Sequence, residues 1–588
     1  MAIVYFRIEL SYCSFPNKIF VMKSQQNHLL FSIFLMGGII ACNNNNRSIS
    51  QQSINDIKLK KGEVISCSPG KAEYGTLEFL TSCKEETKEN FNTGVKLLHS
   101  FEYDEAEKMF AKIIDKDPEC AMAYWGVAMS NFHPLWSPPT TDELIKGNKA
   151  IELATTISNK TEREEAYINA IATYYNNWEK TDHRTRCLKF EAAMKDLHTA
   201  HPKDIEASIF YALALTAAAD PSDKSYAKQR VAGKLLDALY DKYPDHPGIV
   251  HYIIHTFDTP ELATLALNAA KKYAAVAPSS AHALHMPSHI FTRLGLWDES
   301  IQSNYNSVTS AKCYAEAAGI KGHWDEELHG LDYLMYGYLQ KGDNINAKKQ
   351  VDYLKTITEV APANSKVAYA FAAIPARYVI ENKLWKEAAN LTFHKANFNW
   401  ENHPWEKAIT HFARILGSIN TGDLTAARLE LKELQKAQNK LLAMNETFKA
   451  NKVLVQVNAA EAWILFKEGK NDEAIQKMNA AADQEDKTGK HPVTPGDIIP
   501  ARELLGDMLM KMNKPADAFT VYEASLKNTP NRFNSVYGAF ISAKHSGNDF
   551  QAKAYSNQLL NISKTGNSGR PELITVKKFL KESNIASL

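Results

Sequence analysis

Apolar and small residues recur at helical intervals along most of this chain, and polar or Gly-containing breakers divide the pattern into short segments. Helix-forming residues dominate between these breakers. Alternating runs of Val, Ile and Thr bounded by turn pairs, which would predict strands, are nearly absent. We therefore predict an all-α protein with roughly a dozen antiparallel helical hairpins between residues 86 and 560.

Two distant stretches carry the same residue types at the same spacing. In each, a Gly is followed after 12 residues by Ala, after 4 more by an aromatic residue and after 8 more by Pro: Gly94, Ala106, Phe110 and Pro118, then Gly506, Ala518, Tyr522 and Pro530. This order matches the tetratricopeptide (TPR) repeat of about 34 residues. Its small residues let two helices approach, and its aromatic ring fills the gap. The pattern predicts an α-solenoid of TPR-like hairpins.

Weaker copies fill the middle of the chain. We expect turns between helices at Gly295, Gly342, Gly469 and Gly547, and a further second helix beginning at Trp385. Residues 133–139 and 491–496 are rich in Pro, which cannot continue a helix, so both are expected to be ordered loops. The predicted divisions are a signal peptide with an upstream extension (1–41), a tether and N-terminal segment (42–85), an N-terminal TPR-like array containing the histidine cluster (86–345), a C-terminal array (346–560) and a tail (561–588).

The N-terminus has the pattern of an export signal. A short apolar run, Leu29–Ile40, precedes Ala41 and Cys42, and it is too short to cross a bilayer as a stable helix. The Cys after Ala41 resembles a bacterial lipobox, which predicts lipidation at Cys42 and a location at the cell envelope, in the outer membrane or facing the periplasm. An ordinary signal peptide or an unremoved anchor is the alternative. The polar residues 43–61 are expected to form a flexible tether.

Charge and cysteine content narrow the class of partner. Lys and Arg number 68 and Asp and Glu 67, and no nucleic-acid-binding motif is present, so we expect no nucleic-acid partner. In an exported protein Cys67 and Cys83 are candidates for a disulfide. The three remaining cysteines lie among Ala and Tyr in stretches expected to be helical. We therefore predict that they are small core residues: Cys120, Cys187 and Cys313.

Histidines are concentrated in one window. Eight of the 19 lie between His246 and His329. Several share a helix face by their spacing, and imidazole and carboxylate groups at such spacings bind Zn²⁺ and related divalent ions. The candidate metal ligands are His251, His255, Asp258, His282, His285, His289, His329 and Asp332. Pro287 is expected to break the helix inside this set.

Two other interpretations of the histidines stay open, namely hydrogen-bonded packing and adventitious metal capture. The HExxH arrangement of zinc proteases is absent, because residues 251–255 lack its Glu. Nucleophile-elbow, Walker and dinucleotide-binding patterns are absent as well. Carboxylates of the region act as general bases only if a metal is bound: Asp258, Asp325, Glu326 and Glu327.

Four segments together resemble a group of bacterial tetratricopeptide-repeat proteins: Phe91–Phe101, Ala121–Ser130, His285–Gly295 with its His-Met-Pro-Ser-His-Ile-Phe-Thr-Arg-Leu-Gly block, and Pro500–Met508. The likeness runs from about Cys83 to about Gly547. The resemblance implies a helical-repeat protein. It supplies no activity and no catalytic residue.

Two functions follow from the sequence. The first is an envelope-anchored lipoprotein that binds a peptide, protein or small ligand in a concave groove, with His133, Trp136, Arg293 and Trp324 as candidate groove residues. The alternative is a metal-dependent, hydrolase-like enzyme that uses the histidines between residues 251 and 289. A purely scaffolding lipoprotein is a third possibility.

Overall fold

The computed structural model describes residues 49–67, 73–135, 138–396, 398–566 and 569–585. The predicted signal peptide, Cys42 and Trp136 lie outside the described residues, so lipidation stays a prediction. Among the described helices, none combines the length and apolar character that a membrane-crossing segment requires.

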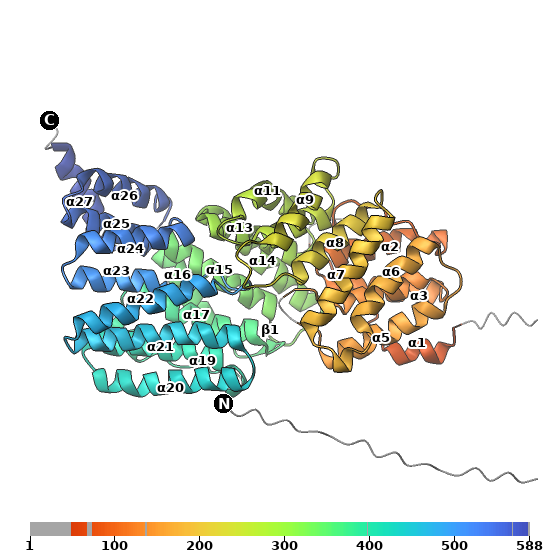
Figure 1. The fold of residues 1–588 in the computed structure, drawn as a ribbon, viewed down its shortest axis with the longest axis horizontal. Coiled ribbons are helices and arrows are strands. Elements are labelled where there is room, and N and C mark those ends of the chain that lie inside the picture. Colours follow the sequence, from red (N-terminus) through yellow and green to blue (C-terminus); the bar gives the residue numbers. More distant parts are fainter. Residues whose placement is uncertain (1–48, 68–72, 136–137, 397, 567–568, 586–588) are drawn as a thin grey trace, which may run out of the picture. The chain divides into compact units, whose positions relative to one another are not determined.

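The described chain is built almost entirely of helices (Figure 1). Its first half contains α1 (Gln51–Ile57), α2 (Lys88–His99), α3 (Tyr103–Lys116), α4 (Ala121–Ser130), α5 (Thr141–Thr156), α6 (Glu162–Tyr175), α7 (His183–Ala200), α8 (Ile205–Ala217), α9 (Ala227–Tyr240), α10 (Pro247–Phe257), α11 (Leu267–Val276), α12 (Ala281–His285) and α13 (Pro287–Leu294). Short 3-10 turns occur at Glu85–Thr87, Trp178–Lys180, Ala263–Ala266 and Trp400–Asn402.

The second half contains α14 (Trp297–Ala317), α15 (Asp325–Gln340), α16 (Asn344–Leu354), α17 (Ser365–Glu381), α18 (Trp385–Ala389), α19 (Pro404–Thr421), α20 (Leu424–Ala443), α21 (Thr447–Lys467), α22 (Asn471–Thr488), α23 (Ala501–Lys511), α24 (Pro515–Asn528), α25 (Phe533–His545), α26 (Asp549–Ile562) and α27 (Pro571–Ile585). Two two-residue strands, β1 (His323–Trp324) and β2 (Val360–Ala361), pair in parallel.

The helices pack as a solenoid of hairpins. Most helices pack mainly against the next one in the chain, as α2 does on α3 and α21 on α22. The first helix of one hairpin also packs on the first helix of the next, as in α2 with α4 and α21 with α23. Figure 1 shows α19 to α22 lying side by side in this manner. The predicted all-α solenoid of TPR-like hairpins is confirmed.

The aromatic residue of the N-terminal repeat lies between two glycines. A Cβ built on Gly94 would lie 2.8 Å from the Phe110 ring, and one on Gly126 would lie 2.4 Å from it. Real Cβ contacts do not come this close, so the ring fits only because both helices lack a side chain at these positions. Gly94 and Phe110 therefore have the roles that the repeat register predicts.

The C-terminal repeat uses the same arrangement. A Cβ on Gly506 would lie 2.7 Å from the Tyr522 ring, and one on Gly538 would lie 2.4 Å from it. Tyr522 is almost fully buried, and its hydroxyl donates to the Asp507 carboxylate at 2.5 Å. The register predicted from residue spacing is thus confirmed at both ends of the array.

The expected turns are also present. Gly295, Gly342, Gly469 and Gly547 follow helix ends with φ of +66°, +73°, +83° and +76°, conformations that L side chains rarely adopt. Trp385 begins α18, as expected, although this helix has only five residues. The Pro-rich stretch at residues 491–496 forms the expected loop between α22 and α23.

Two segments differ from expectation. The stretch predicted as a tether contains α1, which buries Ile54 and Ile57 and packs on α5, because these two apolar residues share one face of a short helix. The predicted tail contains α27, which packs on α26 and buries Val576 and Phe579 in the terminal core cluster. Both ends of the described chain are therefore part of the packed array.

The core also divides differently from the expected boundary after residue 345. Buried apolar residues from α1 to α13 form one cluster, and those of α14 to α17 form another. A third cluster runs from α17 to α25, and a fourth covers α25 to α27. The first break in the apolar core thus falls just before α14.

The cysteines pair in a way that the sequence did not predict. Cys67 bonds to Cys313, and Cys83 bonds to Cys120, so neither Cys120 nor Cys313 is the unpaired core residue expected. Only tertiary packing brings these partners together, since Cys67 and Cys313 are 246 residues apart. Cys187 is buried and unpaired as predicted, and burial raises the pKa of its thiol to about 12.

Candidate metal centre

Helix α10 supplies the first histidine pair. Pro247 begins the helix at a position where its missing N–H costs nothing. His251 and His255 follow at i and i+4 on one face, and Asp258 is the C-cap residue. Most of the remaining side chains of the helix are apolar and buried. The helix therefore holds two imidazoles one turn apart, of which His251 is buried and His255 is partly exposed.

The chain next contributes histidines at the break between α12 and α13. Helix α12 carries His282 and His285 and ends there, and α13 begins at Pro287 and carries His289. This is the break expected at Pro287, whose ring nitrogen cannot donate to the preceding turn. Gly295, with its left-handed conformation, then ends α13. The short helices place three histidines within eight residues.

Six histidines gather into two trios. The first trio is His251, His255 and His282, and the second trio is His285, His289 and His329. In each trio one ligand atom from every residue lies within 4.8 Å of the others. The candidate ligands therefore form two separate sets, in which each i, i+4 pair has a third histidine of its own.

Two predicted ligands have other positions. Asp332, one turn after His329 on α15, is buried and pairs with Arg377 Nε at 3.2 Å. Asp258 contacts His289 through its carboxylate and belongs to neither trio. Neither carboxylate therefore belongs to a trio of candidate imidazole ligands.

In the first trio, His251 and His255 are hydrogen-bonded to each other, and one ring nitrogen of His282 has no hydrogen-bond partner among the described residues. His251 Nε2 and His255 Nε2 are 2.8 Å apart. The Nδ1–H of His251 donates to the backbone oxygen of His99 at 2.5 Å, which leaves its Nε2 with a lone pair. His282 Nε2 is buried and has no hydrogen-bond partner among the described residues. An unpartnered buried nitrogen is costly and indicates a missing partner such as a metal ion.

The second trio brings two lone pairs together. His285 Nδ1 lies 2.7 Å from Asn304 Oδ1, and the Asn304 amide nitrogen donates to the Ser300 carbonyl at 2.7 Å. Asn304 Oδ1 is therefore an acceptor, and His285 must carry its proton on Nδ1. His289 must do the same, because its Nδ1 lies 3.0 Å from the Asp258 carboxylate.

With both protons on Nδ1, the two Nε2 atoms face each other at 3.0 Å without a proton between them. The Tyr333 hydroxyl lies 3.3 Å from His289 Nε2, and its single proton satisfies one nitrogen at most. The third member, His329, packs on His285 with ring centroids 4.3 Å apart. This arrangement needs a shared proton or a shared cation.

Burial disfavours a protonated, positively charged imidazole at this site. Burial, followed by interaction with neighbouring histidines, lowers the pKa of His255 and His329 well below the usual value, and it lowers the pKa of His282 to about 3. The rings are therefore neutral, which is the form that binds metal ions. The two trios are neighbours, because His289 of the second trio is hydrogen-bonded to Asp258, the C-cap residue of the helix that carries His251 and His255.

A charged group behind His289 orients its ring. Asp258 accepts from His289 Nδ1 at 3.0 Å and from Arg293 Nε at 2.8 Å, and Lys490 Nζ lies 3.6 Å away. Although burial opposes it, Lys490 and Arg293 hold the pKa of Asp258 well below its usual range. A carboxylate that fixes the tautomer of a histidine is typical of the second shell of metal sites. Arg293 therefore lies beside the candidate metal centre, where it pairs with Asp258.

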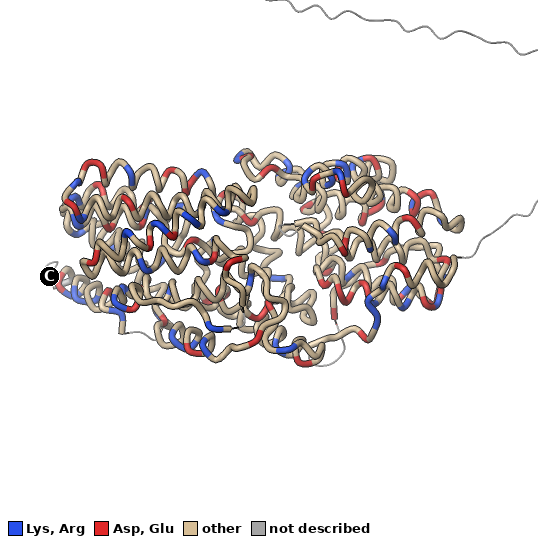
Figure 2. Tube along the Cα trace, turned by 90° about the horizontal axis from the view of Figure 1, so that it is seen from below, with Lys and Arg blue, Asp and Glu red and all other residues tan. Residues whose placement is uncertain are grey.

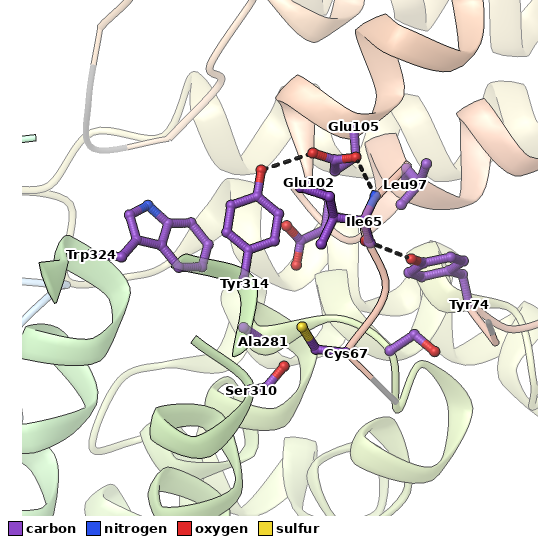
Figure 3. Close-up of a pocket in the computed structure, with 11 residues that line it drawn as sticks. Ile65, Cys67, Tyr74, Leu97, Glu102, Glu105, Ala281, Ser310, Tyr314 and Trp324 are labelled. Atoms are coloured by element: carbon purple, nitrogen blue, oxygen red, sulfur yellow. Dashed lines mark hydrogen bonds between the residues drawn. The ribbon is translucent and has the colours of Figure 1, made fainter. Parts of the chain in front are cut away.

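The remaining predicted groove residues lie elsewhere. His133 contacts Glu143 at 3.1 Å and packs on Tyr103. Trp324 stacks on Tyr314 with ring centroids 4.4 Å apart. This ring pair lines a small pocket that Ala281, the residue before His282, also borders. Figure 3 shows Tyr314 and the backbone of Ile65 both directed at Glu105 in this pocket.

A further buried cluster was missed by sequence reasoning. His99 and His246 each contact one oxygen of Glu206, at 2.9 and 2.8 Å, and His99 Nδ1 also contacts the Tyr252 hydroxyl at 2.9 Å. Both Glu206 oxygens are thus occupied, whereas His246 Nδ1 is buried without a hydrogen-bond partner among the described residues. The members of this cluster are too far apart in the chain for spacing to reveal them.

Acidic and basic residues are interspersed along the helices, and neither sign forms a continuous stretch in the view of Figure 2. The expectation that nucleic acid is not a partner stays a prediction.

Comparison with protein-family models finds no match, and neither does comparison with curated proteins. Among solved structures, the chain is similar to the human IFIT1 dimer with PPP-AAAA, at 12% identity over 80% of this chain and 89% of that chain, with a TM-score of 0.32. It is also similar to Naa15/Naa10 bound to HypK-THB (11% identity, 85% and 92% covered, TM-score 0.26) and to the P58(IPK) TPR domain (16%, 65% and 99%, TM-score 0.19). The assignment of TPR-like hairpins therefore stands on the packing of the chain itself.

Proposed function

We propose that this protein binds transition-metal ions, one in each histidine trio, inside an exported array of TPR-like hairpins. The observation that carries the proposal is the approach of His285 Nε2 and His289 Nε2 to 3.0 Å when both rings are committed to Nδ1–H. A cation between the two nitrogens removes the lone-pair repulsion. The unpartnered Nε2 of His282 gives the first trio the same need.

Hydrogen-bonded packing explains the site less well. That interpretation requires each ring nitrogen to meet a donor or acceptor of the surrounding helices. The Nδ1 atoms of His251, His285 and His289 do so, through His99 O, Asn304 and Asp258. Their Nε2 atoms instead point toward other imidazoles. In metal-bound histidine, one ring nitrogen is hydrogen-bonded to the protein and the other points to the metal ion. The histidines of this site have the same arrangement.

The ligand type restricts the metal. Neutral imidazoles suit zinc, copper, nickel and iron, whereas magnesium and calcium require oxygen ligands. Three histidines with one further position match catalytic zinc sites. The hydrolase-like alternative would use that position for water, with Glu326, which forms an ion pair with Lys366, as a candidate base.

The cellular setting is part of the same proposal. Lipidation at Cys42 would place the array at the cell envelope, and two disulfides suit an exported protein. Hairpin arrays of this kind form extended binding surfaces, so a protein or peptide partner fits the fold as a second role. The metal centre is the part that the geometry supports by named atoms.

The test is metal binding by the mature chain and two matched variants. Purified protein is stripped with a chelator and titrated with Zn²⁺, and bound metal is counted by elemental analysis. We expect two ions per chain. His289→Gln should lose one ion or bind it roughly 100-fold more weakly or worse, since removal of an outer-shell partner alone costs about 10–100-fold. His545→Gln, at an exposed position on α25, is the control.

Thermal melting gives a second readout. Because metal binds only the folded site, adding Zn²⁺ to stripped protein should raise the melting temperature, and the rise should shrink in His289→Gln. If stripped wild type binds no more zinc than His289→Gln does, the histidines are packing residues and the proposal is wrong.

A further inference from the structure

A tyrosine packs against every histidine of the second trio. Tyr333 is buried on α15, four residues after His329, so the helix places these two side chains on one face. The Tyr333 ring centroid lies 4.8 Å from that of His285, 5.2 Å from that of His289 and 5.4 Å from that of His329. The trio therefore has beside it a fourth side chain that carries a possible ligand atom.

The hydroxyl of Tyr333 contacts one of the candidate ligand nitrogens. Its oxygen lies 3.3 Å from His289 Nε2, and the structure shows no other hydrogen bond from this hydroxyl to a described residue. The same nitrogen of His289 lies 3.0 Å from His285 Nε2. His329 offers a ring nitrogen within 4.8 Å of the ligand nitrogens of the other two histidines. His289 Nε2 thus has both a nitrogen and an oxygen as close neighbours.

The two short separations resemble those between ligand atoms around one small cation. Zinc binds nitrogen at about 2.0–2.1 Å and oxygen at about 2.0–2.2 Å in a tetrahedral shell. By geometry, neighbouring ligand atoms of such a shell lie about 3.3 Å apart. The separations of 3.0 Å to His285 Nε2 and 3.3 Å to the Tyr333 oxygen are both within about 0.3 Å of that value.

Burial distinguishes the second trio from the first trio. All three rings of the second trio are buried, as is Tyr333, whereas His255 and His282 of the first trio are partly exposed. Structural zinc sites are closed by four protein ligands, while catalytic sites leave one position to water. A buried trio with a tyrosine oxygen beside it matches the closed kind of site. The first trio has the exposure that a bound water or substrate requires.

Charge also favours a tyrosine oxygen as the fourth ligand. Imidazole binds metal ions in its neutral form, so three imidazoles leave both charges of a divalent ion uncompensated in a buried site, which is costly. The Asp258 carboxylate already offsets Arg293 and Lys490. Metal ligands bind in their deprotonated form, so Tyr333 would release its hydroxyl proton to solvent and contribute one negative charge. A phenolate ligand thus halves the net charge of the centre.

We propose that the second trio and Tyr333 form a closed, four-ligand site for a divalent transition-metal ion such as Zn²⁺, with Tyr333 bound as a phenolate. This inference rests on the proposed metal-binding function and adds an oxygen ligand to it. The bound ion joins α12 and α13 to α15, so its role is structural. The first trio is then the site with a free position for water or substrate.

The test uses Cu²⁺ as a spectroscopic probe, because a phenolate bound to Cu²⁺ gives a visible charge-transfer band that imidazole ligands do not give. The parent protein is His255→Gln, in which only the second trio is complete. Tyr333→Phe removes the oxygen and keeps the ring that packs on the three imidazoles. Tyr305→Phe, at an exposed position on α14, is the matched control. Zn²⁺ affinity is measured by competition with a chelator.

In the parent and in Tyr305→Phe we expect one Cu²⁺ per chain and the charge-transfer band. Tyr333→Phe should lose the band and bind Zn²⁺ about tenfold more weakly or worse, because it lacks one ligand. Melting of the metal-free proteins checks that Tyr333→Phe is folded, and the band of the parent decides the question independently of that variant.

Two results would overturn the assignment of Tyr333 while leaving metal binding intact. One is a parent that binds Cu²⁺ without the band, and the other is a band that persists in Tyr333→Phe. Absence of bound metal in both the parent and wild type would instead reject the proposed function itself.

Discussion

The contact between Gly506 and Tyr522 yields a quantitative test of the repeat register. The Tyr522 ring has little room to move aside, because Gly538 also lies against it and Asp507 holds its hydroxyl at 2.5 Å. Even a Cβ at Gly506 would lie 2.7 Å from the ring, and leucine adds three more carbons. Overpacking a core in this way costs about 1–3 kcal/mol.

The opposing effect is smaller. Replacing glycine by leucine inside a helix gains about 1 kcal/mol in helix propensity. With a packing cost near the upper end of its range, Gly506→Leu should lower the free energy of unfolding by about 2 kcal/mol. The assay is urea denaturation followed by circular dichroism. Gly569→Leu is the control, because Gly569 is exposed and no heavy atom lies within 4 Å of its built Cβ.

A double-mutant cycle isolates the contact. In a Tyr522→Leu background the smaller side chain leaves room, so Gly506→Leu should cost at least about 1 kcal/mol less than in wild type. The reasoning is refuted if Gly506→Leu is as stable as the Gly569→Leu control, or if its cost is the same in both backgrounds.

Three further predictions concern buried charge and the anchor. Burial raises the pKa of Glu406 from 4.5 to about 7, so ionisation of this carboxyl destabilises the folded protein as pH rises through that range. Glu406→Gln should therefore raise the free energy of unfolding by about 3 kcal/mol at pH 8 and by almost nothing at pH 4. An equal effect at both pH values in denaturation experiments would contradict this prediction. Arg532 is fully buried between Glu381 and Glu503, so Arg532→Met should leave both carboxylates without this partner. The free energy of unfolding, measured by denaturation, should fall by about 3–5 kcal/mol. An unchanged midpoint would show that the ion pairs contribute nothing. Cys42→Ser should release the protein from membranes or leave it unprocessed on fractionation, and wild-type behaviour would disprove the lipobox assignment.

The histidine centre was only partly visible in the sequence. The i, i+4 spacing of His251 and His255 correctly placed them on one helix face, and Pro287 correctly marked the break between α12 and α13. Spacing did not reveal that His282 and His285, three residues apart, belong to different trios. It also did not show that Asp332 forms an ion pair with Arg377. These assignments depend on which helix faces which.

Contacts that residue spacing does not indicate complete the site. Asn304 and Asp258 decide the tautomers of His285 and His289, yet neither stands at a distinctive spacing from its partner. Partners that meet through packing are set by helix position in three dimensions, which residue spacing does not encode.

By itself, the sequence determined the all-α solenoid, the repeat register at Gly94 and Gly506 and the helix faces that carry the histidines. Helix periodicity and the need for small residues at close contacts are local rules, so they are written directly in residue spacing. Tertiary structure alone decided the grouping of the six histidines into two trios and the disulfide partners of Cys67 and Cys83. These depend on the relative positions of helices far apart in the chain, because a ligand set closes only when distant side chains arrive within a few ångströms of one another.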